Sequence, residues 1–272
     1  MSLYMYEIGP ASAPTIVFLH GGGGGGWMWR PQWEELKDFH MLVPDLPGHG
    51  QSESINPFTI DDSAAGVAEL IRTRAHGGRA HVVGLSEGAQ ITLALLARNP
   101  ELVLRAIVSS ALVRPIPGAN LLSPGLIAFS VKWFVEPFRN VDWWIRLNMK
   151  YSAGVPEIYY PHFKKDFQNL TGDLFAQVMV QNQRFRLPEG LRQISVPTLV
   201  VAGKREYGVM RQSVRDIVAA IPTAKGFLVH HSRNLSLAEE HNWNLTAPGL
   251  FTQMVRAWIT DTPLPAELHS IR

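Results

Sequence analysis

The 272-residue sequence contains no cysteine. That absence excludes disulfide scaffolds, thiolate nucleophiles, iron–sulfur clusters and cysteine-based zinc sites. Net charge is also scarce, because 25 lysine and arginine residues stand against 23 aspartate and glutamate residues, which leaves a formal charge of +2. So small an excess argues against a nucleic-acid-binding protein.

Signals for secretion or membrane insertion are missing as well. Residues 1–6 contain neither the basic nor the apolar segment of a signal peptide. The longest apolar stretch, residues 121–138, is interrupted by Pro124, Lys132 and Glu136 and is not expected to span a bilayer. With 46% hydrophobic and 18% charged residues, the composition is typical of a soluble, core-forming protein, and we expect it in the cytoplasm.

Short apolar runs bounded by glycine and proline recur along the chain. They comprise residues 15–20, 40–45, 81–85, 104–109, 197–202 and 226–230. Such nearly continuous apolar runs are typical of parallel strands that are covered on both faces. A helical pattern from Glu87 to Arg98 follows the third run directly. The sequence therefore predicts an α/β fold with a mostly parallel, doubly covered sheet.

Residues 112–196 depart from this alternation. They contain no convincing strand, several helical stretches and half of the chain's aromatic residues. We expect a core formed by residues 1–111 and 197–272, with residues 112–196 inserted as a helical cap. A cap that helps to line a pocket must present apolar side chains to it.

The strongest chemical signal is Gly84-Leu85-Ser86-Glu87-Gly88, a G-x-S-x-G motif between a predicted strand and a predicted helix. Glycines on both sides of a serine allow a sharp turn that exposes the hydroxyl. The helix start behind it offers free N–H groups to a developing anion. The alternative is a tight turn that contains a serine by chance.

A second signal is His20 followed by six glycines and Trp27. A plain turn needs only one or two glycines, so this loop is expected to bring bare N–H groups to a substrate oxygen. The same glycines also fit a dinucleotide-binding fingerprint, with Asp45 about 20 residues on. That alternative is disfavoured because residues 27–31, Trp-Met-Trp-Arg-Pro, are a poor helix start for cradling a pyrophosphate.

These features together resemble the α/β-hydrolase family. The resemblance is carried by His20-Gly21-Gly22, the segment from Pro44 to Ser52, the motif around Ser86, the strand that ends at Gly203, and a late histidine. It covers almost the whole chain except the cap. It implies an eight-stranded, mostly parallel sheet, a helical cap between strands six and seven, and a serine–acid–histidine triad that needs no cofactor and no metal.

The resemblance also implies the partners of the serine. In the family the acid follows the strand that here ends at Gly203, where Glu206 is the well-placed candidate; an ion pair with Arg205 or Lys204 is its alternative role. The family's histidine precedes a proline by seven residues, as His241 precedes Pro248. His231 remains the alternative base.

The predicted function is therefore serine hydrolysis of a small-to-medium, apolar carboxylic ester, with a small molecule and no nucleic acid as partner. The expected catalytic residues are Ser86, His241 and Glu206, and the oxyanion is expected to bind the N–H groups of Glu87 and of Gly22 or Gly23. The expected pocket residues are Trp27, Trp133, Trp144, Tyr159 and Trp243. Carbon–carbon bond hydrolysis, a lyase or perhydrolase reaction, and a non-catalytic ligand-binding role remain alternatives.

Overall fold

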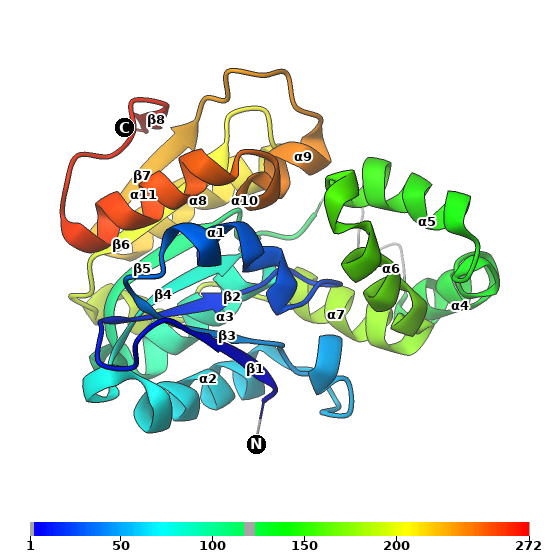
Figure 1. Cartoon of the computed structure of the whole chain (residues 1–272), viewed down its shortest axis with the longest axis horizontal. Helices are drawn as coiled ribbons and strands as arrows, with labels where there is room; N and C mark the ends of the chain where they lie inside the picture. Colours follow the sequence, from blue (N-terminus) through cyan, green and yellow to red (C-terminus); the bar gives the residue numbers. More distant parts are fainter. Residues whose placement is uncertain (1–2, 117–122, 272) are drawn as a thin grey trace.

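A computed structural model describes residues 3–116 and 123–271. Its centre is one eight-stranded sheet in the order β1-β3-β2-β4-β5-β6-β7-β8 (Figure 1). The strands are β1 (Met5–Ile8), β2 (Thr15–Leu19), β3 (His40–Pro44), β4 (Ala80–Leu85), β5 (Val103–Ser109), β6 (Thr198–Gly203), β7 (Ala224–Val229) and β8 (Leu268–Ser270). All neighbours are parallel except the β1–β3 and β7–β8 pairs.

The six strands predicted from apolar runs are confirmed as β2 to β7. The eight strands that the resemblance implied are confirmed, but the apolar runs did not locate the two edge strands, β1 and β8. Both are short and largely exposed or half-buried, so neither has the continuous apolar character that marks a strand buried on both faces.

Helices cover both faces of the sheet, as predicted. Within β2, Val17 and Leu19 pack with one buried cluster, whereas Ile16 and Phe18 pack with another, because successive strand residues point to opposite faces. The helices of the first face are α2 (Ile60–Arg74), α3 (Glu87–Arg98) and α8 (Gly208–Ala220), and those of the second include α1 (Arg30–Glu35) and α11 (Pro248–Thr260).

The predicted helical insertion contains α4 (Pro124–Phe134), α5 (Asp142–Asn148), α6 (Tyr160–Asn169) and α7 (Gly172–Arg184). These helices lie to one side of the sheet (Figure 1). The resemblance placed the insertion between strands six and seven. Among the described residues, five strands precede it, so it lies between β5 and β6 of this chain. Residues 117–122 of the expected cap, with the first two residues of the apolar stretch 121–138, lie outside the described residues, as do residues 1–2 and 272.

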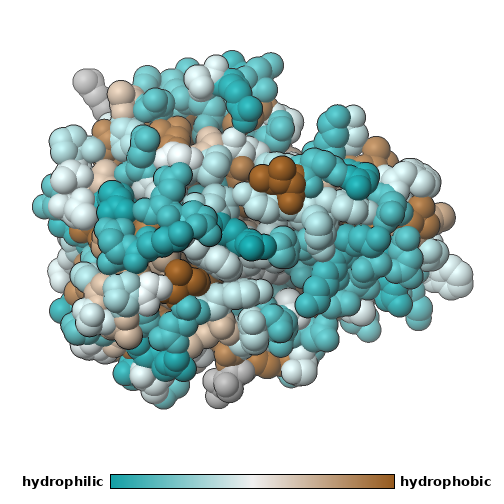
Figure 2. All heavy atoms as spheres, viewed as in Figure 1, coloured by the Kyte–Doolittle hydropathy of each residue, from teal (hydrophilic) through white to brown (hydrophobic). Residues whose placement is uncertain are grey.

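The face of the molecule in Figure 2 is predominantly hydrophilic, with apolar residues scattered over it. The helical insertion nevertheless exposes several aromatic side chains, among them Phe129, Trp133 and Trp143. In the described ranges, no helix combines the length and apolar character needed to cross a bilayer.

Candidate active site

Ser86 occupies the turn between β4 and α3. Its backbone has φ 55° and ψ −112°, a conformation that is costly for a residue with a side chain. The turn is held by the Ser86 N–H, which donates to Ser109 O at 2.9 Å, and by the Gly88 N–H, which donates to His20 O at 3.0 Å. A Cβ at Gly84 would lie 2.3 Å from Gly88 O, and one at Gly88 would lie 2.2 Å from Leu19 O. Both glycines are therefore required by close backbone contacts.

The variant Gly88→Ala is expected to lower the free energy of unfolding by several kcal/mol, because the added methyl group meets a backbone carbonyl that cannot rotate away. Gly125→Ala is the matched control, since a Cβ there meets no atom within 4 Å and alanine favours a helix. Urea unfolding of both variants checks this expectation. Equal stabilities would show that the turn accommodates a methyl group.

A chain of hydrogen bonds leads from Ser86 into the core. Ser86 Oγ lies 2.9 Å from His241 Nε2, and His241 Nδ1 lies 2.5 Å from Glu206 Oε1. Glu206 is fully buried, and its Oε2 accepts hydrogen bonds from the Ser110 hydroxyl at 2.8 Å and from the Gly203 N–H at 3.0 Å. A carboxylate at Nδ1 favours the imidazole tautomer that protonates Nδ1, which leaves Nε2 free to accept the serine proton. The arrangement can activate the Ser86 hydroxyl as a nucleophile.

Local structure explains how the two partners reach the serine. Glu206 lies in the turn after β6, and His241 is the last residue of α9 (Leu237–His241), which a Ser236–Glu239 capping box starts. Glu240, the residue before His241, accepts the Arg205 N–H at 3.1 Å. Its carboxylate lies against Gly203, where a Cβ would be 2.2 Å from Glu240 Oε2. Glu240 thus supports the loop that carries Glu206.

The alternative histidine and the alternative ion pair occupy other places. His231 packs edge-on against Trp243, with 5.7 Å between ring centroids, and burial lowers its pKa. It forms no hydrogen bond with Ser86 among the described residues. Glu206 forms no ion pair with Arg205 or Lys204 in the described part of the chain; its carboxylate contacts His241 Nδ1 instead.

The glycine-rich loop passes directly beside Ser86. A Cβ at Gly21 would lie 3.4 Å from Ser86 Cβ. Backbone N–H groups of Gly22, Gly23 and Glu87 donate to no group among the described residues. They are therefore available to a ligand next to the serine.

The loop does not continue as a dinucleotide-binding motif. A 3₁₀ turn, Gly26–Trp29, follows the glycines, and α1 begins only at Arg30. The Asp45 carboxylate accepts the Gly26 N–H at 2.7 Å and the Gln51 N–H at 2.8 Å. Both of its oxygens thus hold loops together rather than facing a ribose.

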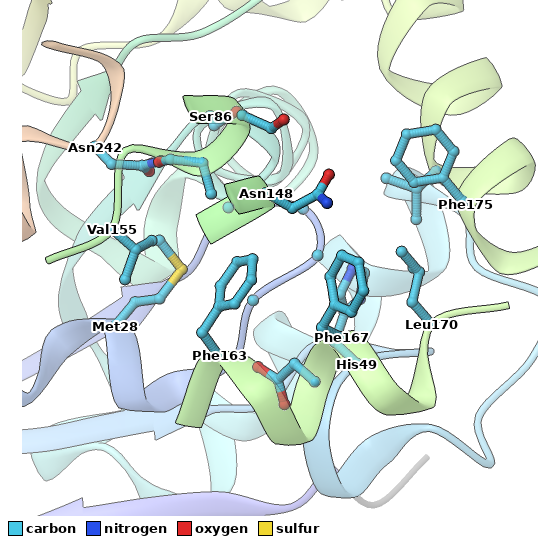
Figure 3. Close-up of a pocket in the computed structure, with 18 of the residues that line it drawn as sticks. Met28, His49, Ser86, Asn148, Val155, Phe163, Phe167, Leu170, Phe175 and Asn242 are labelled. Carbon is cyan, nitrogen blue, oxygen red and sulfur yellow. The ribbon is translucent and has the colours of Figure 1, made fainter. Parts of the chain in front are cut away.

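Ser86 and His241 border a cavity of about 450 Å³ between the sheet edge and the helical insertion (Figure 3). Its lining is mostly apolar and comes largely from the insertion. Besides Trp27 and Ala153, the apolar side chains are Met28, Val131, Val135, Val155, Phe163, Phe167, Leu170, Leu174, Phe175, Val178 and Met179. Most of these were not singled out by the sequence, because aliphatic residues on cap helices give no signal that separates cavity lining from cap core.

Of the five expected pocket residues, the structure places only Trp27 in the lining. Trp133 points outward and is 60% exposed. Trp144 packs against Phe138 and Trp143 within the insertion. The other two lie close by without lining the cavity: Tyr159 packs on the Trp27 ring, and Trp243 is fully buried and donates to Ser109 Oγ at 3.0 Å.

The side chain of Glu87 is a feature that the sequence did not reveal. It is buried behind the glycine loop, 3.5 Å from Asn182 Nδ2 and 3.8 Å from His49 Nε2. Burial raises the pKa of Glu87 from 4.5 to about 8, against the opposing effect of the Asn182 hydrogen bond. The carboxyl is therefore neutral at pH 7, next to the proposed nucleophile.

This burial predicts a pH-dependent stability difference between the wild type and Glu87→Gln. Between about pH 4.5 and pH 8 the folded state keeps the Glu87 proton that the unfolded state has lost, so rising pH favours unfolding by about 1.4 kcal/mol per pH unit. The amide cannot ionise, so the variant escapes this loss and gains stability relative to the wild type as the pH rises through that window. Urea unfolding at pH 5, 7 and 9 measures the difference. A pH-independent difference would contradict a buried neutral carboxyl.

The sheet, the strand–turn–helix that carries Ser86 and the hydrogen-bonded chain behind it are those of an α/β hydrolase. Residues 16–251 match the model of the Alpha/beta hydrolase family, and the chain belongs to this family. The resemblance seen in the sequence is thereby confirmed. A protein of Gibberella zeae described as an AB hydrolase superfamily protein is 32% identical over 258 residues, which are 92% of this chain and 82% of that protein.

Solved structures share the fold over nearly the whole chain. An enol-lactonase from Burkholderia xenovorans has a TM-score of 0.71 and 22% identity, and covers 95% of this chain and 96% of its own. A thermophilic esterase from Thermogutta terrifontis also has a TM-score of 0.71, with 20% identity and coverage of 95% and 93%. At these identities the likeness establishes the fold.

Proposed function

We propose that this α/β hydrolase cleaves small-to-medium, largely apolar carboxylic esters through an acyl-enzyme on Ser86. The observation that carries the proposal is the hydrogen-bonded chain Ser86–His241–Glu206, whose serine end opens into an apolar cavity. A serine on a strained turn, hydrogen-bonded to a histidine that is in turn hydrogen-bonded to a buried acid, is the arrangement of a serine-hydrolase triad.

In the first half of the reaction, Ser86 Oγ attacks the ester carbonyl carbon while His241 Nε2 takes the hydroxyl proton. His241 then gives that proton to the leaving alkoxide, which departs as an alcohol and leaves the acyl group on Ser86. In the second half, His241 deprotonates water, which attacks the acyl carbon. The carboxylic acid product then leaves, and His241 returns the proton to Ser86 Oγ. Glu206 keeps the imidazole oriented and stabilises its cationic form throughout.

Charge on the carbonyl oxygen develops in both halves. The free N–H groups of Glu87 and of Gly22 or Gly23 are the proposed donors to this oxyanion, and each is expected to contribute roughly 3–4 kcal/mol to the transition state. The dipole of α3, which begins at Glu87, acts in the same direction.

The cavity supports the proposed substrate class. Its volume of about 450 Å³ lies in the range of small-molecule sites, and its aliphatic and phenyl lining favours apolar acyl or alcohol groups. Two structural neighbours are described as an enol-lactonase and an esterase, and these names agree with a carboxylic-ester substrate.

The proposal is tested with a fluorophosphonate probe and a panel of p-nitrophenyl esters of increasing acyl length. We expect covalent labelling at Ser86, identified by peptide mass spectrometry, and turnover that is highest for short and medium acyl chains. Labelling without turnover of any ester would favour cleavage of another bond, such as a carbon–carbon bond. Absence of labelling would favour a non-catalytic ligand-binding role.

The proposed role of Glu206 predicts a large loss of turnover in Glu206→Gln. The amide keeps the size of the side chain but favours the wrong imidazole tautomer, so kcat is expected to fall by up to about 10⁴-fold. Glu206→Asp retains the charge and is expected to keep more activity. The exposed Glu189, changed to glutamine, is the matched control. Near-wild-type kcat in Glu206→Gln would reduce the proposed triad to a Ser86–His241 dyad.

A further inference from the structure

One acidic side chain, Asp166 of α6, lines the otherwise mostly apolar cavity. It shares a helix face with Phe163, because residues three positions apart on a helix are neighbours, and it directly precedes Phe167, which also lines the cavity. Among the described residues of the lining, no other is aspartate or glutamate and none is lysine or arginine. No described lysine or arginine therefore shares the cavity lining with this carboxylate, and the adjacent Lys165 has the smallest of the effects on its pKa.

Only one oxygen of this carboxylate is satisfied by the protein. Asp166 Oδ2 accepts a hydrogen bond from Trp27 Nε1 at 2.6 Å, whereas Oδ1 accepts none from the described residues. No described lysine, arginine or histidine forms an ion pair with it. Burial raises the pKa of Asp166 to about 6, and the Trp27 hydrogen bond opposes this rise. At neutral pH the carboxyl group is thus mostly ionised. Its side chain is only partly buried, and Oδ1 is not one of the fully buried side-chain atoms that lack a partner, so this oxygen is accessible to a ligand.

Asp45 shows how a purely structural carboxylate is built into the same region. It is buried, and each of its oxygens accepts a backbone N–H, from Gly26 and from Gln51. If Asp166 served only to tie the insertion to the glycine loop through Trp27, an uncharged amide would do so without burying a charge. The unused oxygen of Asp166 is consistent with a ligand group that arrives from the cavity.

The surroundings of Asp166 identify that group as a cation of organic character. The rings of Trp27, Phe163 and Phe167 also line the cavity, and aromatic faces together with a carboxylate are the groups that attract an ammonium ion. In Figure 3, Ser86 lies on one side of the drawn cavity, and Phe163 and Phe167 lie on another. We propose that Asp166 and these rings form a subsite for a protonated amine at the end of the substrate away from the scissile carbonyl.

This inference rests on the proposed function, and matched substrates test it. Each pair consists of the p-nitrophenyl ester of an ω-amino acid and its isostere with a methyl group in place of the ammonium, at acyl chains of six and eight carbons. The measured quantity is the ratio of kcat/KM values for the two members of a pair. Effects of a variant on folding or on Ser86 act on both members and cancel in the ratio.

The wild type is expected to favour the ammonium member for at least one chain length, and Asp166→Asn is expected to lower that ratio by about tenfold to a hundredfold. Asp166→Glu keeps the charge and should retain part of the preference. Asp173→Asn, which removes an exposed carboxylate from the neighbouring α7, is the matched control. An unchanged ratio in Asp166→Asn would overturn the proposal.

The structural alternative is tested with Trp27→Phe, which removes the indole N–H but keeps an aromatic ring. The ammonium preference should persist in this variant if Asp166 contacts the substrate. A loss as large as that in Asp166→Asn would instead assign Asp166 to holding the insertion in place, and the subsite would be rejected.

Calorimetric binding of hexylammonium, compared with 1-hexanol, separates the subsite from the reaction. We expect hexylammonium to bind the wild type more tightly than the alcohol, and Asp166→Asn to abolish the difference. If no ester is hydrolysed but this binding difference is present, the proposed function fails and the subsite stands. If esters are hydrolysed at Ser86 without an ammonium preference or a binding difference, only the subsite fails.

Discussion

The Ser86→Ala variant is expected to lose about 10⁶-fold in kcat, the scale seen when a triad nucleophile is removed. The hydroxyl supplies the attacking oxygen, and no other described side chain places an oxygen within hydrogen-bond distance of His241 Nε2. Stability should hardly change, because Ser86 is half-buried and the described hydrogen bond of its Oγ is the one to His241. Steady-state hydrolysis of the best p-nitrophenyl ester measures the loss, after a melting curve has shown an intact fold.

Ser54→Ala provides the comparison, since it removes an exposed hydroxyl from a turn outside the cavity. Its turnover should equal that of the wild type. Substantial esterase activity in a folded Ser86→Ala protein would reject Ser86 as the nucleophile and, with it, the acyl-enzyme.

The second large effect is expected in His241→Ala, which removes the proposed base. Its kcat should fall about as far as in Ser86→Ala, because residues that act as one unit lose nearly the whole effect when any essential member is removed. His231→Ala should retain most of the turnover. That ring packs against Trp243 rather than Ser86, so its loss is expected to lower the melting temperature but not kcat.

Comparing kcat of the two variants, each with its own melting temperature, decides between the histidines. The reverse ranking would mean that the segment between β7 and α11 adopts a different arrangement during turnover. Equal losses with intact folds would indicate that both rings take part in proton transfer.

The sequence predicted those strands of the sheet that are buried on both faces. Strands β2 to β7 and helix α3 could be predicted because buried parallel strands are almost wholly apolar and because glycine or proline borders most of these runs. The same rule misses β1 and β8, whose exposed residues carry no such pattern. The helical insertion was found by its lack of strands, but its place in the strand order came from the resemblance and was one strand too late for this chain.

Motif and spacing placed Ser86, Glu206 and His241 as candidates, and the structure brings them together in one hydrogen-bonded chain. The cavity wall could not be predicted in this way. Val131 lines the cavity, whereas Trp133, two positions later on α4, is exposed, and only the packing of α4 on its neighbours decides which of them turns inward. Composition favoured the tryptophan because aromatic residues stand out in a sequence. The neutral Glu87 side chain was missed for a related reason, since the residue type alone does not show whether a glutamate is buried and its pKa raised.

The helical insertion is one uninterrupted stretch of chain, and this continuity has a genetic consequence. Most of the cavity wall lies within it, while Ser86, Glu206 and His241 lie outside it. A recombination with breakpoints near the codons for residues 112 and 197 would therefore replace most of the surface that contacts a substrate and leave the three proposed catalytic residues in place. The incoming segment has to restore the hydrogen bonds to the core, among them the Asn242 side-chain bond to Ala153 O at 2.6 Å and the Trp27 Nε1 bond to Asp166 Oδ2 at 2.6 Å. Preference for a substrate and reactivity toward it can thus be inherited from different parents.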